Sequence, residues 1–274
     1  MQKVACGVIL YNPDIEKVIK DIIRYSSLFD EVILFDNTSK ECEKIQRYIE
    51  DLPNVSYLRD GYNVGLPKAY NRIIQKLEKY DYLCALDQDS LYKSEDIHMM
   101  IKAIDYFPSD AAVVGPHIIY NNNETFCKGN YFLKRRYVIT SGCFINLNYM
   151  RKEHIVFDEK YFIDKFEVDL DMQFRKKGYS IYEYENAILY QQLGTLGKNG
   201  RSNHSPIRHY YLFRNRFYFN HKYFGILKRY ILNVLQTLRQ ILRILILEEN
   251  KVNKIKQLPI AIKDYLHGRM EKYV

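Results

Sequence analysis

The feature that most constrains the fold is a regular alternation of short apolar runs and helix-like segments over the first 115 residues. The apolar runs have the length of strands, and their nearly continuous hydrophobicity fits strands buried on both faces; they are residues 4–11, 31–35, 55–58, 82–86 and 111–115. Between them, apolar side chains recur every three or four residues and predict helices over residues 15–23, 45–52, 66–77 and 97–107. Strands that alternate with single helices form right-handed βαβ units. The sequence therefore predicts an α/β fold with a Rossmann-like, mostly parallel sheet and helices on both faces.

The pattern is less regular after residue 115. We expect loops over residues 117–147 with short strands at 137–140 and 143–147, then a helix over 164–177 ended by Gly178, and extended segments at 180–184 and 187–190. Residues 194–206 are rich in Gly, Ser and Asn and predict a mobile loop, and a long helical stretch follows over 209–249. A chain of 274 residues is long for one domain and short for two. We therefore predict a main domain over residues 1–220, divided near residue 115, and a helical, basic extension over 221–274.

Charge is distributed unevenly along the chain. Residues 186–274 contain 16 Lys and Arg against 4 Asp and Glu, whereas residues 1–185 contain 25 and 29. Aromatic side chains are interleaved with the basic ones from residue 208 onwards, and residues 226–247 combine apolar and basic positions. This composition predicts an interfacial helix at an anionic membrane surface. Packing on the main domain or a homodimer interface is the alternative. No nucleic acid partner is expected, because no nucleic-acid-binding signature accompanies the aromatic residues.

The sequence also predicts where the protein works. No uncharged apolar run reaches the roughly 18 residues of a membrane span, and no basic leader or cleavage site follows Met1. We therefore expect neither a spanning helix nor a signal peptide. The five cysteines are scattered and lack a C-x-x-C pair, which argues against a disulfide framework or a zinc cluster and favours a reducing compartment. The expected location is the cytoplasm, peripheral at the inner face of the cell membrane.

The residues that follow the predicted strands are the candidates for a functional site, because ligands of parallel α/β sheets bind beyond the carboxyl ends of the strands. Asp87 and Asp89 follow the fourth strand. Two carboxylates one residue apart can hold a hard divalent cation together with substrate phosphate oxygens. The alternative is a solvated turn in which Ser90 or Ser94 caps the next helix. Asp36 ends the second strand, where it either accepts a hydrogen bond from a nucleotide base or forms a simple Asx turn.

These residues belong to a series of motifs whose order and spacing resemble glycosyltransferase family two. The series is Tyr11-Asn12-Pro13, Phe35-Asp36-Asn37-Thr38-Ser39, Asn63-Val64-Gly65, Leu86-Asp87-Gln88-Asp89-Ser90, Thr140-Ser141-Gly142, Phe157-Asp158-Glu159 and Gly178-Tyr179. Later residues are similar to the rhamnosyltransferase branch of that family, namely Leu193-Gly194, His204, Arg208, Tyr210-Tyr211 and Arg214-Asn215. Any one motif is weak, whereas the ordered set is specific and covers most of the chain.

The resemblance implies a GT-A fold and an inverting sugar transfer. Residues 1–115 would bind the nucleotide-sugar and residues 116–220 the acceptor. The expected donor is dTDP-rhamnose, with a UDP-sugar as the alternative, and the expected acceptor is a hydroxyl of a lipid-linked glycan. By the resemblance, Asp36 contacts the base, Asp87 approaches the ribose, and Asp89 holds Mg²⁺ or Mn²⁺ on the diphosphate. Further expected donor contacts are Tyr11, Asn12, Asn63, Gly65, Lys68, His204 and Arg208, and the further metal ligands are Asp87 and Gln191.

The resemblance also implies a general base at the start of the helix predicted over residues 164–177. Counted back from Gly178, Glu167 takes the base position and Asp169 the second acidic position. Glu167 and Asp171 are four residues apart and share one helix face, while Asp169 points elsewhere. The non-catalytic alternative is an acidic first turn that complements the helix dipole.

Three positions depart from the family pattern. The base is Glu rather than the commoner Asp. Gln191 stands where many relatives carry His, and because an amide oxygen is a poorer ligand this predicts weaker metal binding. Tyr70 stands where an Arg is common, so Lys68 or Arg72 is expected to supply that positive charge.

Two other classes of protein are compatible with parts of the sequence. A nucleotidyltransferase also places Asp pairs after a parallel strand, but it should carry a Gly-rich, basic loop where this chain has Asn12-Pro13-Asp14. A basic, non-catalytic adaptor would not need carboxylates at three strand or helix ends.

Overall fold

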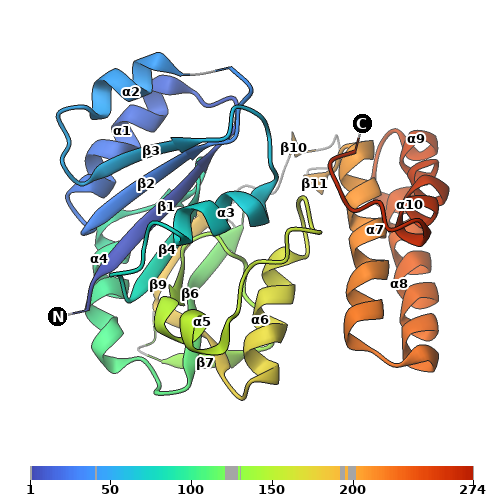
Figure 1. Cartoon of the computed structure of the whole chain (residues 1–274). Coiled ribbons are helices and arrows are strands. Elements are labelled where there is room, and N and C mark those ends of the chain that lie inside the picture. The colour runs from blue at the N-terminus through green and yellow to red at the C-terminus, as the bar shows by residue number, and fades with distance from the viewer. Residues whose placement is uncertain are drawn as a thin grey trace. The chain divides into compact units, whose positions relative to one another are not determined.

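The computed structural model describes residues 2–40, 42–120, 129, 131–191, 195–196 and 202–273. The chain divides into two compact units, one of Met1–Asp158 with Glu167–Gln191 and the other of Glu159–Phe166 with Gln192–Val274. Figure 1 shows the elements of both units in chain order. This division falls at Gln191, whereas the sequence suggested residue 220. Residue 220 lies inside helix α7 (Pro206–Tyr223), which packs within the second unit.

The first unit contains a nine-stranded sheet with the order β3-β2-β1-β4-β8-β6-β9-β5, and β7 pairs with β9. Its strands are β1 (Val4–Leu10), β2 (Glu31–Asp36), β3 (Val55–Arg59), β4 (Tyr82–Asp87), β5 (Leu91–Tyr92), β6 (Ala111–Tyr120), β7 (Phe132–Arg135), β8 (Cys143–Asn146) and β9 (Ser180–Gln191). Strands β1 to β4 are parallel, as predicted. The other half is mixed, because β8 runs antiparallel between β4 and β6, and both β5 and β7 run antiparallel to β9.

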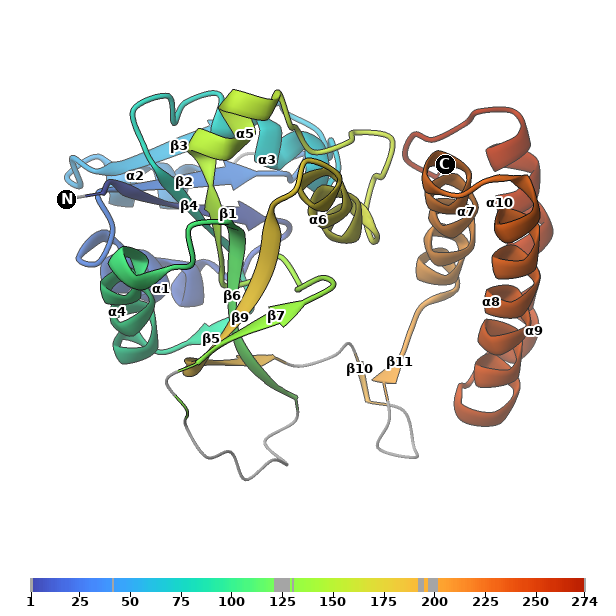
Figure 2. The same ribbon diagram turned by 90° about the horizontal axis from the view of Figure 1, so that it is seen from below.

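Helices cover both faces of this sheet, which confirms the predicted fold class. They are α1 (Ile15–Ser26), α2 (Glu43–Ile49), α3 (Leu66–Ile74), α4 (Ser94–Ala103), α5 (Leu147–Glu153) and α6 (Phe166–Lys176), and a 3₁₀ turn over Ile104–Tyr106 follows α4. In Figure 2, α1 and α4 lie on one face and α3, α5 and α6 on the other. Apolar residues of α1, α2 and α4 pack with Cys6, Val8 and Leu34 in one core cluster. Helix α3 packs on the other face, where Ile73 lies against Gly7 of β1.

The structure corrects several local predictions. Residues 137–140 form no strand, and β7 forms at residues 132–135 instead. The two extended segments after Gly178 are one strand, β9, with an irregularity where Pro116 and His117 of β6 oppose it. The long helix is two helices, α7 and α8 (Ile226–Leu247), because Phe224 is extended and Gly225 is a poor helix former. The loop predicted over 194–206 lies in part outside the described residues. In its described part, β10 (Thr195–Leu196) pairs with β11 (Ser202–Asn203).

The second unit has its own core, built where α7 packs on α8 and on α10 (Gln257–Leu266). Its buried members are Tyr210, Tyr211, Phe213, Phe217, Ile244 and Ala261. Arg214 is fully buried here; its guanidinium lies over the rings of Tyr210 and Tyr211, and it donates to the Glu271 carbonyl over 2.7 Å. The interleaved basic and aromatic residues of α7 therefore fill the interior of this unit in part, and they do not all face an outer surface.

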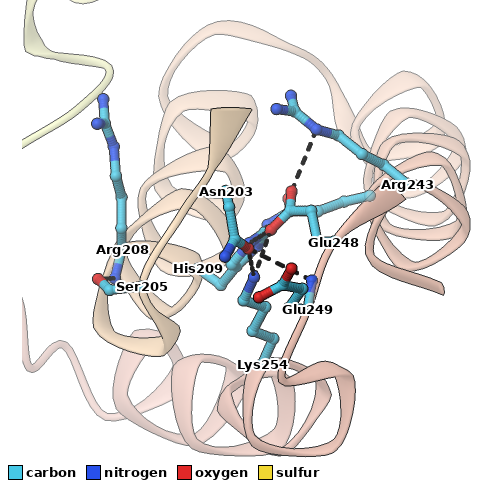
Figure 3. Close-up of polar contacts among 9 residues, drawn as sticks. Asn203, Ser205, Arg208, His209, Arg243, Glu248, Glu249 and Lys254 are labelled. Atoms are coloured by element: carbon cyan, nitrogen blue, oxygen red, sulfur yellow. Dashed lines mark hydrogen bonds and ion pairs between the residues drawn. The ribbon is translucent and has the colours of Figure 1, made fainter. Parts of the chain in front are cut away.

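A buried polar cluster joins α7, α8 and α9 (Lys251–Ile255), as Figure 3 shows. The Glu248 carboxylate accepts from His209 Nε2 and from Lys254 Nζ, each over 2.8 Å, and pairs with Arg243 Nε at 3.2 Å. Gln240 Nε2 donates to His209 Nδ1 over 2.9 Å. Burial alone would raise the pKa of Glu248, but the hydrogen bonds from Lys254 and His209 lower it. Each side-chain nitrogen in this cluster pairs with a buried partner. The cluster therefore holds α7, α8 and α9 together.

Helix α8 bears on the expectation that no helix spans a membrane, which stays a prediction. It has 22 residues, and an 18-residue window of it reaches a mean hydropathy of 1.3 with at most two charged residues, so by length and composition it could cross a bilayer. Its four basic residues, Lys228, Arg229, Arg239 and Arg243, interrupt every long uncharged run, which is why the sequence predicted no span. One such helix is weak evidence for a span, and among the described residues no other helix meets these criteria.

Candidate functional site

The candidate site lies at the carboxyl edge of the first unit's sheet. The register pairs Leu10 of β1 with Asp36 of β2, and Ile9 of β1 with Asp87 of β4. The two acidic strand ends therefore flank the end of β1, where Tyr11 and Asn12 follow. This juxtaposition is what the parallel order of β2, β1 and β4 predicts.

Asp36 is fully buried and engaged on both oxygens. Its Oδ1 accepts from the Thr38 amide over 2.9 Å, and its Oδ2 accepts from the Tyr57 hydroxyl. Thr38 Oγ1 in turn accepts from the Asn12 amide over 2.9 Å. Burial and the neighbouring Asp36 carboxylate raise the pKa of Tyr57, so this phenol stays a hydrogen-bond donor. The Asx turn expected as one alternative is present, and it holds the ends of β1 and β2 together.

The neighbouring Asn37 is buried as well and fixes the loop before α3. Its Oδ1 accepts from the Val64 amide over 2.7 Å. Asn63 Oδ1 accepts from the Gly65 amide over 3.0 Å, and Gly65 has φ 84°, in the left-handed region that favours glycine. Asn63 and Gly65 thus shape the turn that starts α3.

Lys68 and Tyr70 lie on the first turns of α3. Tyr70 is fully buried and stacks on Phe157, with 5.2 Å between ring centroids, so it cannot replace the family's arginine as a cation. Arg72 pairs with Asp60 at 3.3 Å. Lys68 is half-buried and forms no ion pair within the described residues. Of the two cations proposed to compensate, Lys68 is therefore the one available to an anionic ligand.

Gln88, the residue between the two aspartates, makes a two-point contact with the end of β1. Its Oε1 accepts from the Tyr11 amide over 2.8 Å, and its Nε2 donates to the Tyr11 carbonyl over 3.0 Å. The turn after β4 and the turn after β1 are therefore held to each other through one amide side chain. The role of Gln88 is visible only in the folded structure, because its partner Tyr11 is 77 residues away in the chain.

Strand pairing brings Gln191 to the same turn. Asp89 is exposed, and β5 begins two residues later. Leu91 of β5 pairs with Tyr190 of β9, so the next residue of β9, Gln191, lies opposite Ser90. Among the described residues the Gln191 Oε1 atom is buried and has no hydrogen-bond partner.

These oxygen donors fit a hard divalent cation. Within the described part of the chain, no three His, Cys, Asp or Glu side chains are grouped so that they could hold a metal ion by themselves. Mg²⁺ in particular is commonly bound by one or two carboxylates together with substrate phosphate oxygens and water. Asp87, Asp89 and the orphan oxygen of Gln191 match that ligand set, with the remaining positions left to a substrate.

The segment before β8 closes the site beside β4. The hydroxyls of Ser90 and Ser141 share a buried hydrogen bond. Gly142 has φ 78° and donates to the Ala85 carbonyl over 2.7 Å, and a side chain there would meet Pro116 at 2.9 Å. Only glycine fits this backbone, which is the physical reason for the Thr-Ser-Gly run.

Helix α6 presents its acidic residues in two directions. Asp169 is fully buried and accepts from Gln173 Nε2 over 2.8 Å. Asp171 is buried on another side, where it accepts from the Val138 amide over 3.0 Å. Glu167, one turn before Asp171, is half-buried. Glu167 is therefore accessible enough to contact a substrate, whereas Asp169 is enclosed by the protein.

Electrostatic effects connect α6 with the turn after β4. Burial raises the pKa of Asp171 well above its usual range, and the nearby Glu167 carboxylate adds to this. Burial likewise raises the pKa of the Cys143 thiol, with contributions from Asp171 and Asp87. Asp171 and Asp87 thus each lie close enough to the start of β8 to act on the Cys143 thiol. The role of Asp171 is not predictable from the sequence, because its burial follows from tertiary packing.

His204 and Arg208 belong to the second unit. Arg208 pairs with Asp164 at 3.1 Å. Burial, with the cations of Arg208 and Arg243, lowers the pKa of His204 to about 4. At neutral pH the imidazole is uncharged, so a phosphate contact made by His204 would be a neutral hydrogen bond.

Comparison with solved structures places the fold in a class. The structure of TarS residues 1–349 from S. aureus in complex with UDP-GlcNAc has a TM-score of 0.59 at 16% identity, covering 97% of this chain and 81% of that one. GalNAc-T7 with UDP, GalNAc and Mn²⁺ has a TM-score of 0.56 at 12% identity, covering 78% of this chain. This chain spans 47% of the GalNAc-T7 chain, about half its length. At these identities the similarity shows a shared fold, the GT-A fold of nucleotide-sugar-dependent transferases. No curated protein matches the chain significantly.

The sequence model of glycosyl transferase family 2 matches residues 7–164, which is more than half of the chain. The protein belongs to this family.

Proposed function

We propose that the protein is an inverting, metal-dependent glycosyltransferase that moves a sugar from a nucleotide-sugar to a hydroxyl of a glycan. The observation that carries this is that Asp36, Asp87, Asp89 and Gln191 all lie at the carboxyl ends of strands along one edge of the sheet. Family membership and a fold shared with UDP-sugar-binding structures support the same activity.

In the proposed mechanism the donor lies across the ends of β1, β2 and β4. Tyr11 and Asn12 form the floor beneath the nucleoside, held by Gln88 and Thr38. Asp36 is buried with both oxygens engaged, so it orders the turn beside the base and does not bond the base itself. Asp87, Asp89 and Gln191 would hold Mg²⁺ or Mn²⁺. When bound, the cation neutralises the charge that develops on the leaving diphosphate. Lys68 supplies a further positive charge from the start of α3.

The acceptor hydroxyl is deprotonated by Glu167. Its oxygen forms a bond to the anomeric carbon on the face opposite the diphosphate, while the bond from that carbon to the diphosphate oxygen breaks. The proton moves to the Glu167 carboxylate. Asp171 is a positioning residue in this scheme, because it holds the Val138 amide and lies beside Glu167 without reaching the surface.

The proposal extends to the donor sugar and to the acceptor. The donor sugar is rhamnose, carried by dTDP, because the Leu-Asp-Gln-Asp-Ser, Thr-Ser-Gly and Tyr-Tyr-x-x-Arg-Asn runs resemble the rhamnosyltransferase branch. A UDP-hexose is the alternative donor. The acceptor is a lipid-linked glycan at the inner face of the cell membrane, to which the basic C-terminal region attaches the enzyme peripherally.

The proposed function is tested by thermal shift with a panel of nucleoside diphosphates and nucleotide-sugars, each with Mg²⁺, Mn²⁺ or EDTA. A bound ligand raises the apparent stability by mass action, by about 2.7 kcal/mol at a concentration of 100 Kd. We expect the largest shift from one dTDP- or UDP-sugar, and only with a divalent cation. A panel without any shift would contradict a nucleotide-sugar site.

Gln88→Leu is expected to weaken donor binding. The change removes both hydrogen bonds to Tyr11, and two bonds of about 1 kcal/mol each correspond to roughly a tenfold to thirtyfold rise in the donor Kd. Gln88→Glu keeps the acceptor for the Tyr11 amide and loses the donor, so its effect should be intermediate. Isothermal titration with the best donor measures both. A donor Kd unchanged in Gln88→Leu, with the protein folded, would show that Gln88 does not position the site.

A further inference from the structure

Helix α8 in the second unit has its polarity reversed relative to an ordinary amphipathic helix of a water-soluble protein. Exposed aliphatic residues recur every three or four positions along α8; we call them the α8 face, and they are Leu227, Ile231, Leu235, Leu238, Leu242 and Leu245. Their side chains are between 44% and 76% exposed. Such a continuous apolar stripe of helix surface marks an interaction site.

The inward side of α8 carries several amide side chains beside the buried Ile244. Asn220 of α7 donates to Asn233 Oδ1 over 2.7 Å and to Gln236 Oε1 over 3.1 Å. Arg216 of α7 donates to the Gln236 carbonyl over 2.8 Å, and Gln240 is buried against His209. These hydrogen bonds attach α8 to α7, and the Glu248 cluster holds the C-terminal end of α8 (Figure 3).

We infer that the α8 face lies in the plane of an anionic lipid bilayer and inserts into the boundary between headgroups and acyl chains. This deepens the peripheral attachment proposed above and rests on it. Lys228 and Arg239 are exposed along one edge of the α8 face, where they can reach lipid phosphates while the aliphatic side chains enter the bilayer. The neighbouring chain from residue 186 to 247 contains no acidic residue that would repel such a surface.

The packing of α8 decides between lying in the membrane and crossing it. A crossing helix of this length, about 33 Å at 1.5 Å per residue, would match the roughly 30 Å hydrocarbon core. However, the polar side of α8 is covered along its length by α7, whose residues include Arg208, Arg214 and Arg216, and by α9. Crossing would carry these cations into the hydrocarbon or separate them from α8. Lying in the plane leaves the helical packing intact and buries only the α8 face.

The absence of tryptophan from the chain makes a direct test available. Single tryptophans are introduced as Leu227→Trp, Leu238→Trp and Leu245→Trp, near the start, middle and end of the α8 face. The control is Tyr106→Trp in the first unit, at a side chain that is 79% exposed. Each variant is mixed with phosphatidylglycerol-containing vesicles whose acyl chains are brominated at a shallow or a deep position, and quenching of the tryptophan fluorescence is measured.

An in-plane helix predicts similar quenching at all three α8 positions, stronger with the shallow label, and none in the control. Stronger deep quenching at Leu238→Trp than at the two ends would indicate a crossing helix and overturn the proposal. No vesicle quenching, with a blue shift that grows with protein concentration in the absence of lipid, would assign the face to a second copy of the chain. No vesicle quenching without such a shift would also overturn it.

A second measurement separates insertion from electrostatic attraction. At 1 M salt the Debye length falls to about 3 Å, so binding that remains comes from apolar insertion. The triple change Leu235→Gln, Leu238→Gln and Leu242→Gln should lower this remaining vesicle binding at least tenfold, while the matched surface change Ile23→Gln, Tyr106→Gln and Val156→Gln should not. Equal binding by both variants would overturn insertion. Donor binding is measured without vesicles, so a failure here is distinct from a failure of the proposed function.

Discussion

Asp89→Ala is expected to abolish sugar transfer and to remove the dependence of donor binding on a divalent cation. Asp89 is the exposed carboxylate of the turn after β4; Asp87 precedes it by two residues, and Gln191 lies opposite its neighbour Ser90. Stabilisation of a leaving diphosphate by a cation amounts to several kcal/mol, and each 1.36 kcal/mol is a factor of ten in rate, so turnover should fall by about three powers of ten or more.

Steady-state turnover and donor titration with and without Mn²⁺ measure this effect. Glu95→Ala is the matched control, because Glu95 is also an exposed carboxylate, located six residues later in the first turn of α4. The control should keep both its rate and its metal dependence. Unchanged turnover in Asp89→Ala would refute the assignment of the Asp-Gln-Asp turn as the metal site.

Glu167→Gln is expected to lower turnover by about 10²–10⁴, the usual contribution of a positioned general base. The substitution keeps the shape of the side chain and removes its basicity. Because the carboxylate acts on the acceptor hydroxyl and not on the nucleotide, the donor Kd should stay within a factor of about two in the same preparation.

Asp169→Asn is the decisive comparison for Glu167. Asp169 is fully buried and bonded to Gln173, so its substitution should act mainly on stability and leave turnover per folded molecule nearly unchanged. Single-turnover rates, normalised to the folded fraction, distinguish the two. If Asp169→Asn shows the larger loss of turnover with an intact donor Kd, Asp169 is the base and the register taken from Gly178 is wrong.

The core of the candidate site was predictable from local sequence signals. Apolar runs and helical spacing located β1 to β4 and their helices to within a few residues. Asp36 and Asp87 could then be predicted as site residues, because the carboxyl ends of parallel strands meet at one edge.

The C-terminal region was less predictable. Its basic and aromatic residues suggested an outer surface, but Arg214, Tyr210 and Phe213 are buried together. Composition shows which residues a helix contains, but it does not show which of their side chains face the core.

The sequence by itself determined the βαβ pattern and the acidic residues at the strand ends, because hydrophobic periodicity and turn chemistry are local properties. Only the tertiary structure decided which distant segments complete the site. The pairing of β5 with β9 brings Gln191 opposite Ser90 in the turn that carries Asp89, and the antiparallel β8 places Gly142 beside β4. The amide side chain of Gln88 joins two turns that are 77 residues apart in the chain. It likewise decided that α8 turns its amides inward and its leucines outward. Each of these depends on a partner far away in the sequence, and such pairings are selected by burial and hydrogen bonding in the folded chain.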